Sequence, residues 1–165
     1  MDNDSDLMAF NNWRAEQPGA EESGLVFAAN DHAAKSCSVW WAGPETDFLD
    51  RMRAEARARG ITLFLNRAPY SRQELRRAVD LIFGGSERLR QLGFDLQAIA
   101  GPTPEFFGLT VRGAVLGDET AEQLPAHLVA SVRGELGALL QDCQVRLDDV
   151  RIEYGKIASL IHRLG

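Results

Sequence analysis

The sequence predicts a small α+β domain, and three observations support that fold class. The 165-residue chain is 45% hydrophobic and 25% charged, which is the composition of an ordinary globular domain. Apolar residues alternate with polar ones in some stretches, as in strands, and recur every three or four residues in others, as in helices. Glycine and proline separate these stretches. The expected order of elements is ββαβαββαβα, forming a largely antiparallel sheet with helices on one face.

The first 23 residues form a polar, acidic N-terminal segment. The residues in it that could anchor a short helix against the rest of the chain are Leu7, Met8, Phe10 and Trp13. Residues 24–165 show no recognisable repeat and no long linker, so we expect them to form a single domain.

The first half of the domain begins with an expected hairpin. Strands at Leu25–Ala29 and Ser36–Ala42 flank a turn at Asn30 and Asp31. A helix over residues 45–59 follows, and Gly60 ends it as a C-cap. The alternating stretch Ile61–Asn66 predicts the next strand.

A capping box gives the sharpest helix start in the chain. The Ser71 hydroxyl can accept the amide of Glu74, whose carboxylate can reach back to the amide of Ser71. We therefore expect a helix over residues 72–83. Its apolar stripe consists of Leu75, Ala78, Val79, Ile82 and Phe83.

The second half of the domain contains a further expected hairpin and two helices. The expected elements are a helical turn at Ser86–Leu92, strands at Phe94–Ala100 and Leu109–Leu116, a helix at Ala126–Leu140, a strand at Val145–Tyr154, and a short C-terminal helix bearing Ile157, Leu160, Ile161 and Leu164. We expect Asp148 and Asp149 to mark a bend or bulge in the last strand.

The charge of the chain is unevenly distributed. The net charge is −6, which argues against nucleic acid as a partner because phosphate binding requires positive charge. Residues 1–31 hold seven acidic residues and one arginine, whereas residues 51–90 hold ten arginines and four acidic residues. The arginines are interpreted either as the solvated faces of two helices or as part of a contact surface.

The sequence contains no recognisable set of catalytic residues, so we expect no enzyme. Arg88 stands where the motif GxSxG around Ser86 would need its second glycine. The three histidines form no metal-binding or catalytic pairing. A cysteine hydrolase using Cys37 remains an alternative, although this residue lies in the middle of a predicted strand without an activating neighbour.

No metal or cofactor site is expected either. Asp2, Asp4 and Asp6 resemble the start of a calcium loop but lack its glycine and distal glutamate. No glycine-rich phosphate loop is present. The acidic start lacks the pattern of a secretory leader and no long apolar run occurs, so we expect a soluble, cytoplasmic protein without membrane contact.

Two adjacent tryptophans, Trp40 and Trp41, must face opposite sides of their strand. Trp41 shares a side with Cys37 and Val39 and should therefore enter the core. Trp40 then lies with Ser38 on the other side. Either the N-terminal segment containing Trp13 covers it, or it anchors a protein partner, since tryptophan and arginine are favoured at interfaces.

A resemblance supports the second interpretation. The stretches GLVFAANDHAAKSCSVWWAGP, ARGITLFLNRAPYSRQELRRAVDLIF and AIAGPTPEFFGLTV lie within Gly24–Val111, about half of the chain. Together they resemble a domain of actinobacterial secreted proteins that is similar to the pro-region of trypsin-like serine proteases of the α-lytic type. The resemblance implies a non-catalytic domain that packs a sheet face against a partner protease and assists or inhibits it.

The sequence therefore predicts a non-catalytic protein-binding module, either pro-region-like or inhibitor-like. The alternatives are an acidic inhibitor of the immunity or antitoxin kind and a structural subunit of a larger assembly such as a virion or a secretion machine. The expected contact residues are Trp40, Ser38, Arg51, Arg53, Arg57, Arg72 and Arg76.

Overall fold

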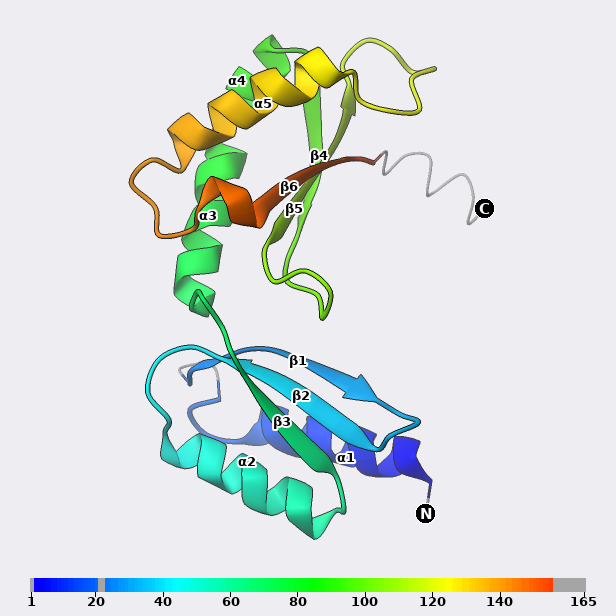
Figure 1. Cartoon of the computed structure of the whole chain (residues 1–165), viewed down its shortest axis with the longest axis vertical. Coiled ribbons are helices and arrows are strands. Elements are labelled where there is room, and N and C mark those ends of the chain that lie inside the picture. The colour runs from blue at the N-terminus through cyan, green and yellow to red at the C-terminus, as the bar shows by residue number, and fades with distance from the viewer. Residues whose placement is uncertain (1, 21–22, 156–165) are drawn as a thin grey trace. The chain divides into compact units, whose positions relative to one another are not determined.

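The computed structural model describes residues 2–20 and 23–155, and it confirms the α+β class (Figure 1). The chain divides into two compact units, one ending at Arg72 and one beginning at Gln73. Each unit holds its own three-stranded sheet. The sequence predicted one domain over residues 24–165. The structure differs because each sheet has a separate set of helices and a separate core to bury.

The first unit contains two helices and the first sheet. Its elements are α1 (Asn3–Glu16), β1 (Leu25–Asp31), β2 (Ser36–Trp41), α2 (Asp47–Ala58) and β3 (Thr62–Arg67). Strand β2 is central, pairing antiparallel with β1 and parallel with β3. Parallel neighbours need a crossover connection, which α2 supplies. Helices α1 and α2 lie on the same face of this sheet (Figure 1).

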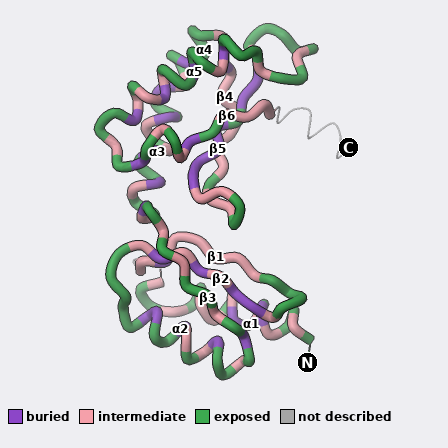
Figure 2. The backbone as a smooth tube through the Cα atoms, viewed as in Figure 1, coloured by how far each residue is buried: buried purple, intermediate pink, exposed green. Residues whose placement is uncertain are grey.

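The core of the first unit lies between that face and the two helices (Figure 2). Cys37, Val39 and Trp41 of β2 are all fully buried, as their alternation predicted. The remaining buried residues of this core are Leu7, Phe10, Leu25, Phe48, Leu49, Met52, Ala56 and Ile61. Met8 was expected to help anchor α1, but its side chain is 64% exposed because it lies on the solvent side of the helix.

The second unit contains the second sheet. Its elements are α3 (Arg72–Gly84), α4 (Ser86–Gln91), β4 (Phe94–Ala100), β5 (Leu109–Val115), α5 (Ala126–Leu139), the 3₁₀ helix Leu147–Asp149 and β6 (Val150–Tyr154), with the first residue of α3 assigned to the first unit. Strand β5 is central, antiparallel to β4 and parallel to β6. The 3₁₀ helix occupies the position of the expected bend, so the last strand begins later than predicted.

The two units share one topology. Each consists of a helix, an antiparallel hairpin, a second helix and a strand parallel to the middle strand, with α4 and the 3₁₀ helix added in the second unit. Both sheets are therefore mixed, whereas a largely antiparallel sheet was predicted. The expected order also omitted α1, whose buried residues Leu7 and Phe10 make only a weak apolar pattern.

Three further expectations concern single segments. Phe83 was placed in the apolar stripe of its helix, yet its side chain is 46% exposed, since it lies beside the buried Ile82 and outside the stripe. The expected C-terminal helix lies outside the described residues. Within the described residues, no helix has the length and apolar character needed to cross a membrane.

Candidate functional site

The two tryptophans of β2 occupy opposite faces of the first sheet, as predicted. Trp41 is 0% exposed, and its indole nitrogen donates a hydrogen bond to the carbonyl oxygen of Pro44 at 3.0 Å. Trp40 is half-buried on the face opposite α1 and α2. Its ring contacts that of Phe27, with the centroids 5.0 Å apart.

Trp13 of the N-terminal segment lies on the other face of the sheet from Trp40. Trp13 belongs to α1, stacks on Phe10 with centroids 6.1 Å apart, and packs against the first core on the opposite face of the sheet. Of the two interpretations of Trp40, cover by Trp13 is therefore wrong.

Three aromatic residues share the face of the first sheet opposite α1 and α2, which we call the aromatic face. They are Phe27 of β1, Trp40 of β2 and Phe64 of β3. Phe27 lies opposite Trp40, and Phe64 lies opposite Ser38, two residues before Trp40 on the same face. The side chain of Phe64 is 53% exposed. An exposed aromatic side chain beside two further rings is typical of a contact surface.

The corresponding face of the second sheet has a different chemistry. Glu153 of β6 pairs there with Arg112 of β5 at 3.7 Å and with Arg151 at 3.4 Å. The Arg151 guanidinium also lies 4.3 Å above the ring of Phe106. These charged groups satisfy one another in the manner of a solvated sheet face. The shared topology therefore presents one charged face and one aromatic face.

Strand β3 forms an edge of the first sheet. Thr62 donates its N–H to the carbonyl of Lys35, and Ala68 donates to that of Trp41. In this parallel register the residues between them alternate, so Leu63 and Leu65 direct their backbone N–H and C=O groups to the open edge. Within the described part of the first unit, no strand pairs with that edge.

The structure does not bring the predicted contact residues together. Ser38 and Trp40 lie on the aromatic face, whereas α2 carries three of the arginines on the opposite side of the sheet. Arg53 pairs with Glu45 at 3.0 Å and with Asp50 at 3.5 Å. Arg51 lies over the Phe48 ring, and Arg57 is exposed to solvent on α2. Arg72 is the first residue of α3, and Arg76 belongs to the second unit.

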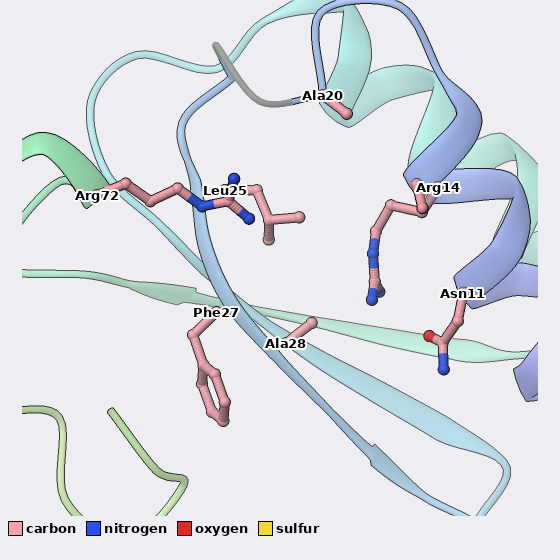
Figure 3. A pocket seen from close by; sticks show the side chains of 8 residues that line it. Asn11, Arg14, Ala20, Leu25, Phe27, Ala28 and Arg72 are labelled. Atoms are coloured by element: carbon pink, nitrogen blue, oxygen red, sulfur yellow. The ribbon is translucent and has the colours of Figure 1, made fainter. Parts of the chain in front are cut away.

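A cavity of about 330 Å³ lies along β1, the other edge of the first sheet (Figure 3). The guanidinium groups of Arg14 and Arg72 both point into it (Figure 3). Its remaining lining residues are Asn11, Ala15, Ala20, Leu25, Phe27 and Ala28. The cavity thus combines an apolar wall with two positive charges.

Cys37 is fully buried in the first core. Burial raises the pKa of its thiol, and the nearby Arg14 guanidinium offsets part of that rise. A buried, protonated thiol is a poor nucleophile. Among the described residues, no three His, Cys, Asp or Glu side chains come together in a way that could hold a metal ion.

Sequence reasoning missed Phe27, Phe64 and the residues of the cavity other than Arg72. A signal for Phe64 was present, since alternation along β3 separates it from Leu63 and Leu65 and places it with polar neighbours. No comparable signal existed for Phe27, because a β-bulge between Leu25 and Phe27 changes the face of the strand on which it lies.

Comparison of the chain with models of protein families, with curated proteins and with solved structures found no match.

Proposed function

We propose that the chain is a non-catalytic protein-binding module that binds an extended segment of another protein along β3 and the aromatic face. The observation that carries this proposal is the contrast between the two sheets. The same topology places paired charges on a sheet face of the second unit, whereas in the first unit it places the half-buried Phe27 and Trp40 beside the 53% exposed Phe64. Solvation alone accounts for the charged face but not for the aromatic one.

The edge of β3 indicates the form of the partner. Exposed edges are commonly protected by lysine, proline or inward-pointing charge, and β3 has none of these between Thr62 and Asn66. A strand added at this edge would form hydrogen bonds with the backbone of Leu63 and Leu65. Its apolar side chains on one face would then lie beside Phe64, with Trp40 one strand further along the same face. The resemblance to pro-regions, which implies a sheet face packed against a protease, agrees with this mode.

A display library of ten-residue peptides with alternating β-branched positions tests the proposal. Peptides selected on the full chain should lose affinity by about tenfold or more with Phe64→Ser, because truncating an interface anchor removes much of the binding energy. Phe83→Ser, which changes an equally exposed phenylalanine in α3, should leave the affinity unchanged. Leu65→Pro should weaken binding as well, since it removes an outward-facing N–H while sparing the bonds to β2.

The tryptophans provide a second comparison on the same strand. Trp40→Ala should abolish capture of the selected peptides while leaving most of the stability of the fold. Trp41→Ala should instead cost about 3–5 kcal/mol of stability through the core. Selected peptides that bind Phe64→Ser and Leu65→Pro as well as the original chain would overturn the proposal. So would a homodimer in sedimentation velocity that Phe64→Ser dissociates, because a second copy would then be the occupant.

A further inference from the structure

The cavity along β1 holds two arginine side chains that lack an ionic partner in the described part of the chain. Arg14 Nη1 lies 3.7 Å from Cys37 Sγ, and its guanidinium lies 5.7 Å from the centre of the Phe10 ring. A thiol is a weak acceptor, and the Arg14 guanidinium makes no other hydrogen bond or ion pair with a described residue. Arg72 points into the same space from the start of α3 (Figure 3).

Asn11 adds a further polar group to this cavity. Its side-chain oxygen is buried and accepts no hydrogen bond from any described residue. A terminal amide can turn to present either its oxygen or its NH₂ group, so Asn11 can donate to an anion beside Arg14. An unpaired buried polar group costs free energy, which a bound ligand with matching polarity would recover.

The rest of the cavity is apolar. Its other lining residues are Leu25, Phe27 and Ala28 of β1 together with Ala15 and Ala20, and the volume of about 330 Å³ lies at the lower end of the range for small-molecule sites. A phosphate group would place charged oxygens against this wall. A carboxylate with a compact apolar body would instead direct its two oxygens to the guanidinium groups, whose planar donors match them.

We propose that this cavity binds a small organic carboxylate with an apolar body, held by Arg14 and Arg72. The site lies at the β1 edge, whereas the proposed function uses the β3 edge, and Phe27 belongs to both the cavity and the aromatic face. Arg14 and Arg72 line the cavity but not the aromatic face, so their variants test carboxylate binding apart from peptide binding.

The probe for this site is 3-phenylpropionate, titrated into the ¹⁵N-labelled full chain and followed by NMR. Saturable shifts are expected at the amides of Arg14, Phe27 and Ala28. The neutral analogue 3-phenylpropionamide and inorganic phosphate should bind at least about tenfold more weakly, since a hydrogen bond to a charged group contributes about 1.5–3 kcal/mol. Equal binding of the amide would overturn the charge-based assignment, and tighter binding of phosphate would overturn the carboxylate.

Matched arginine variants test which positive charges bind the carboxylate. Arg14→Gln should weaken 3-phenylpropionate by about tenfold or more. Arg57→Gln makes the same charge change on the solvated side of α2 and should leave binding within about twofold. Arg72→Gln provides a second test at an exposed position in case Arg14→Gln fails to fold. The proposal would be overturned if the original chain showed no saturable shifts. It would also be overturned if Arg72→Gln and a folded Arg14→Gln both bound 3-phenylpropionate with the affinity of the original chain.

Discussion

The thiol of Cys37 lies in the first core, with the guanidinium of Arg14 as its polar neighbour. Removing the thiolate from water disfavours its ionisation, and this desolvation outweighs the attraction of the guanidinium. The pKa in the folded chain therefore lies above the ordinary value of 9.0. At a pH below this ordinary value, the thiol is protonated in both the folded and the unfolded chain. The contribution of Cys37 to the free energy of unfolding is therefore fully present there.

This pKa difference predicts a loss of stability in alkali. As the pH rises above about 9, the unfolded chain releases the Cys37 proton while the folded chain retains it, so unfolding becomes easier. Urea unfolding between neutral pH and pH 10.5 should show this decline, and Cys37→Ala should make it shallower. Cys143→Ala, which leaves Cys37 in place, serves as the control and should retain the slope of the original chain. An equally steep decline without Cys37 would contradict the prediction.

Local alternation predicted that three β2 side chains enter the core, but it did not predict which residues they meet or that Ser36 is buried on the other face. Cys37, Val39 and Trp41 all enter the core because neighbours on a strand face opposite ways. The contact between Trp40 and Phe27 depends on a bulge in β1, and no feature of the sequence marks its position. The cavity likewise unites residues of α1 and β1 with Arg72, the last residue of the first unit, and their meeting is set by packing rather than by spacing.

Helix α3 shows how well a local capping signal defines an element. It begins at Arg72, directly after Ser71, and buries Leu75, Ala78 and Ile82 as the apolar period predicted. The expected and observed boundaries of α3 agree because the capping box and the apolar stripe both depend on residues in or next to the helix itself. The parallel pairing of β2 with β3 was missed because it depends on a partner 26 positions away in the chain.

Ser71→Ala tests the start of α3. Loss of an N-cap hydroxyl should lower the free energy of unfolding by about 1 kcal/mol, because a helix-start amide loses its acceptor. Urea unfolding gives this value directly. Ser131→Ala changes an exposed serine inside α5 and should cost little, since alanine favours helix interiors. A Ser71→Ala chain as stable as the original would mean that this hydroxyl does not cap the helix.

At the scale of the whole molecule, one topology occurs twice with two separate cores. The first core is built around Trp41 and Leu49, and the second around Phe94, Val111 and Leu136. Sequence similarity does not reveal this shared topology, because it requires a similar apolar pattern and not similar residues. Different side chains on one backbone plan allow one sheet to expose aromatic residues and the other to expose ion pairs.

The separate cores predict that a core substitution acts first on its own unit. All three tryptophans of the chain, at positions 13, 40 and 41, lie in the first unit, so their fluorescence reports its unfolding, whereas circular dichroism reports both units. Trp41→Ala should lower the fluorescence midpoint, read from Trp13 and Trp40, while circular dichroism retains a later transition. Phe94→Ala, at a fully buried position of the second core, should leave the fluorescence midpoint close to that of the original chain and shift the other transition. If both probes moved together in both variants, the units would unfold as one cooperative structure, since a substitution in either core would then destabilise the whole chain.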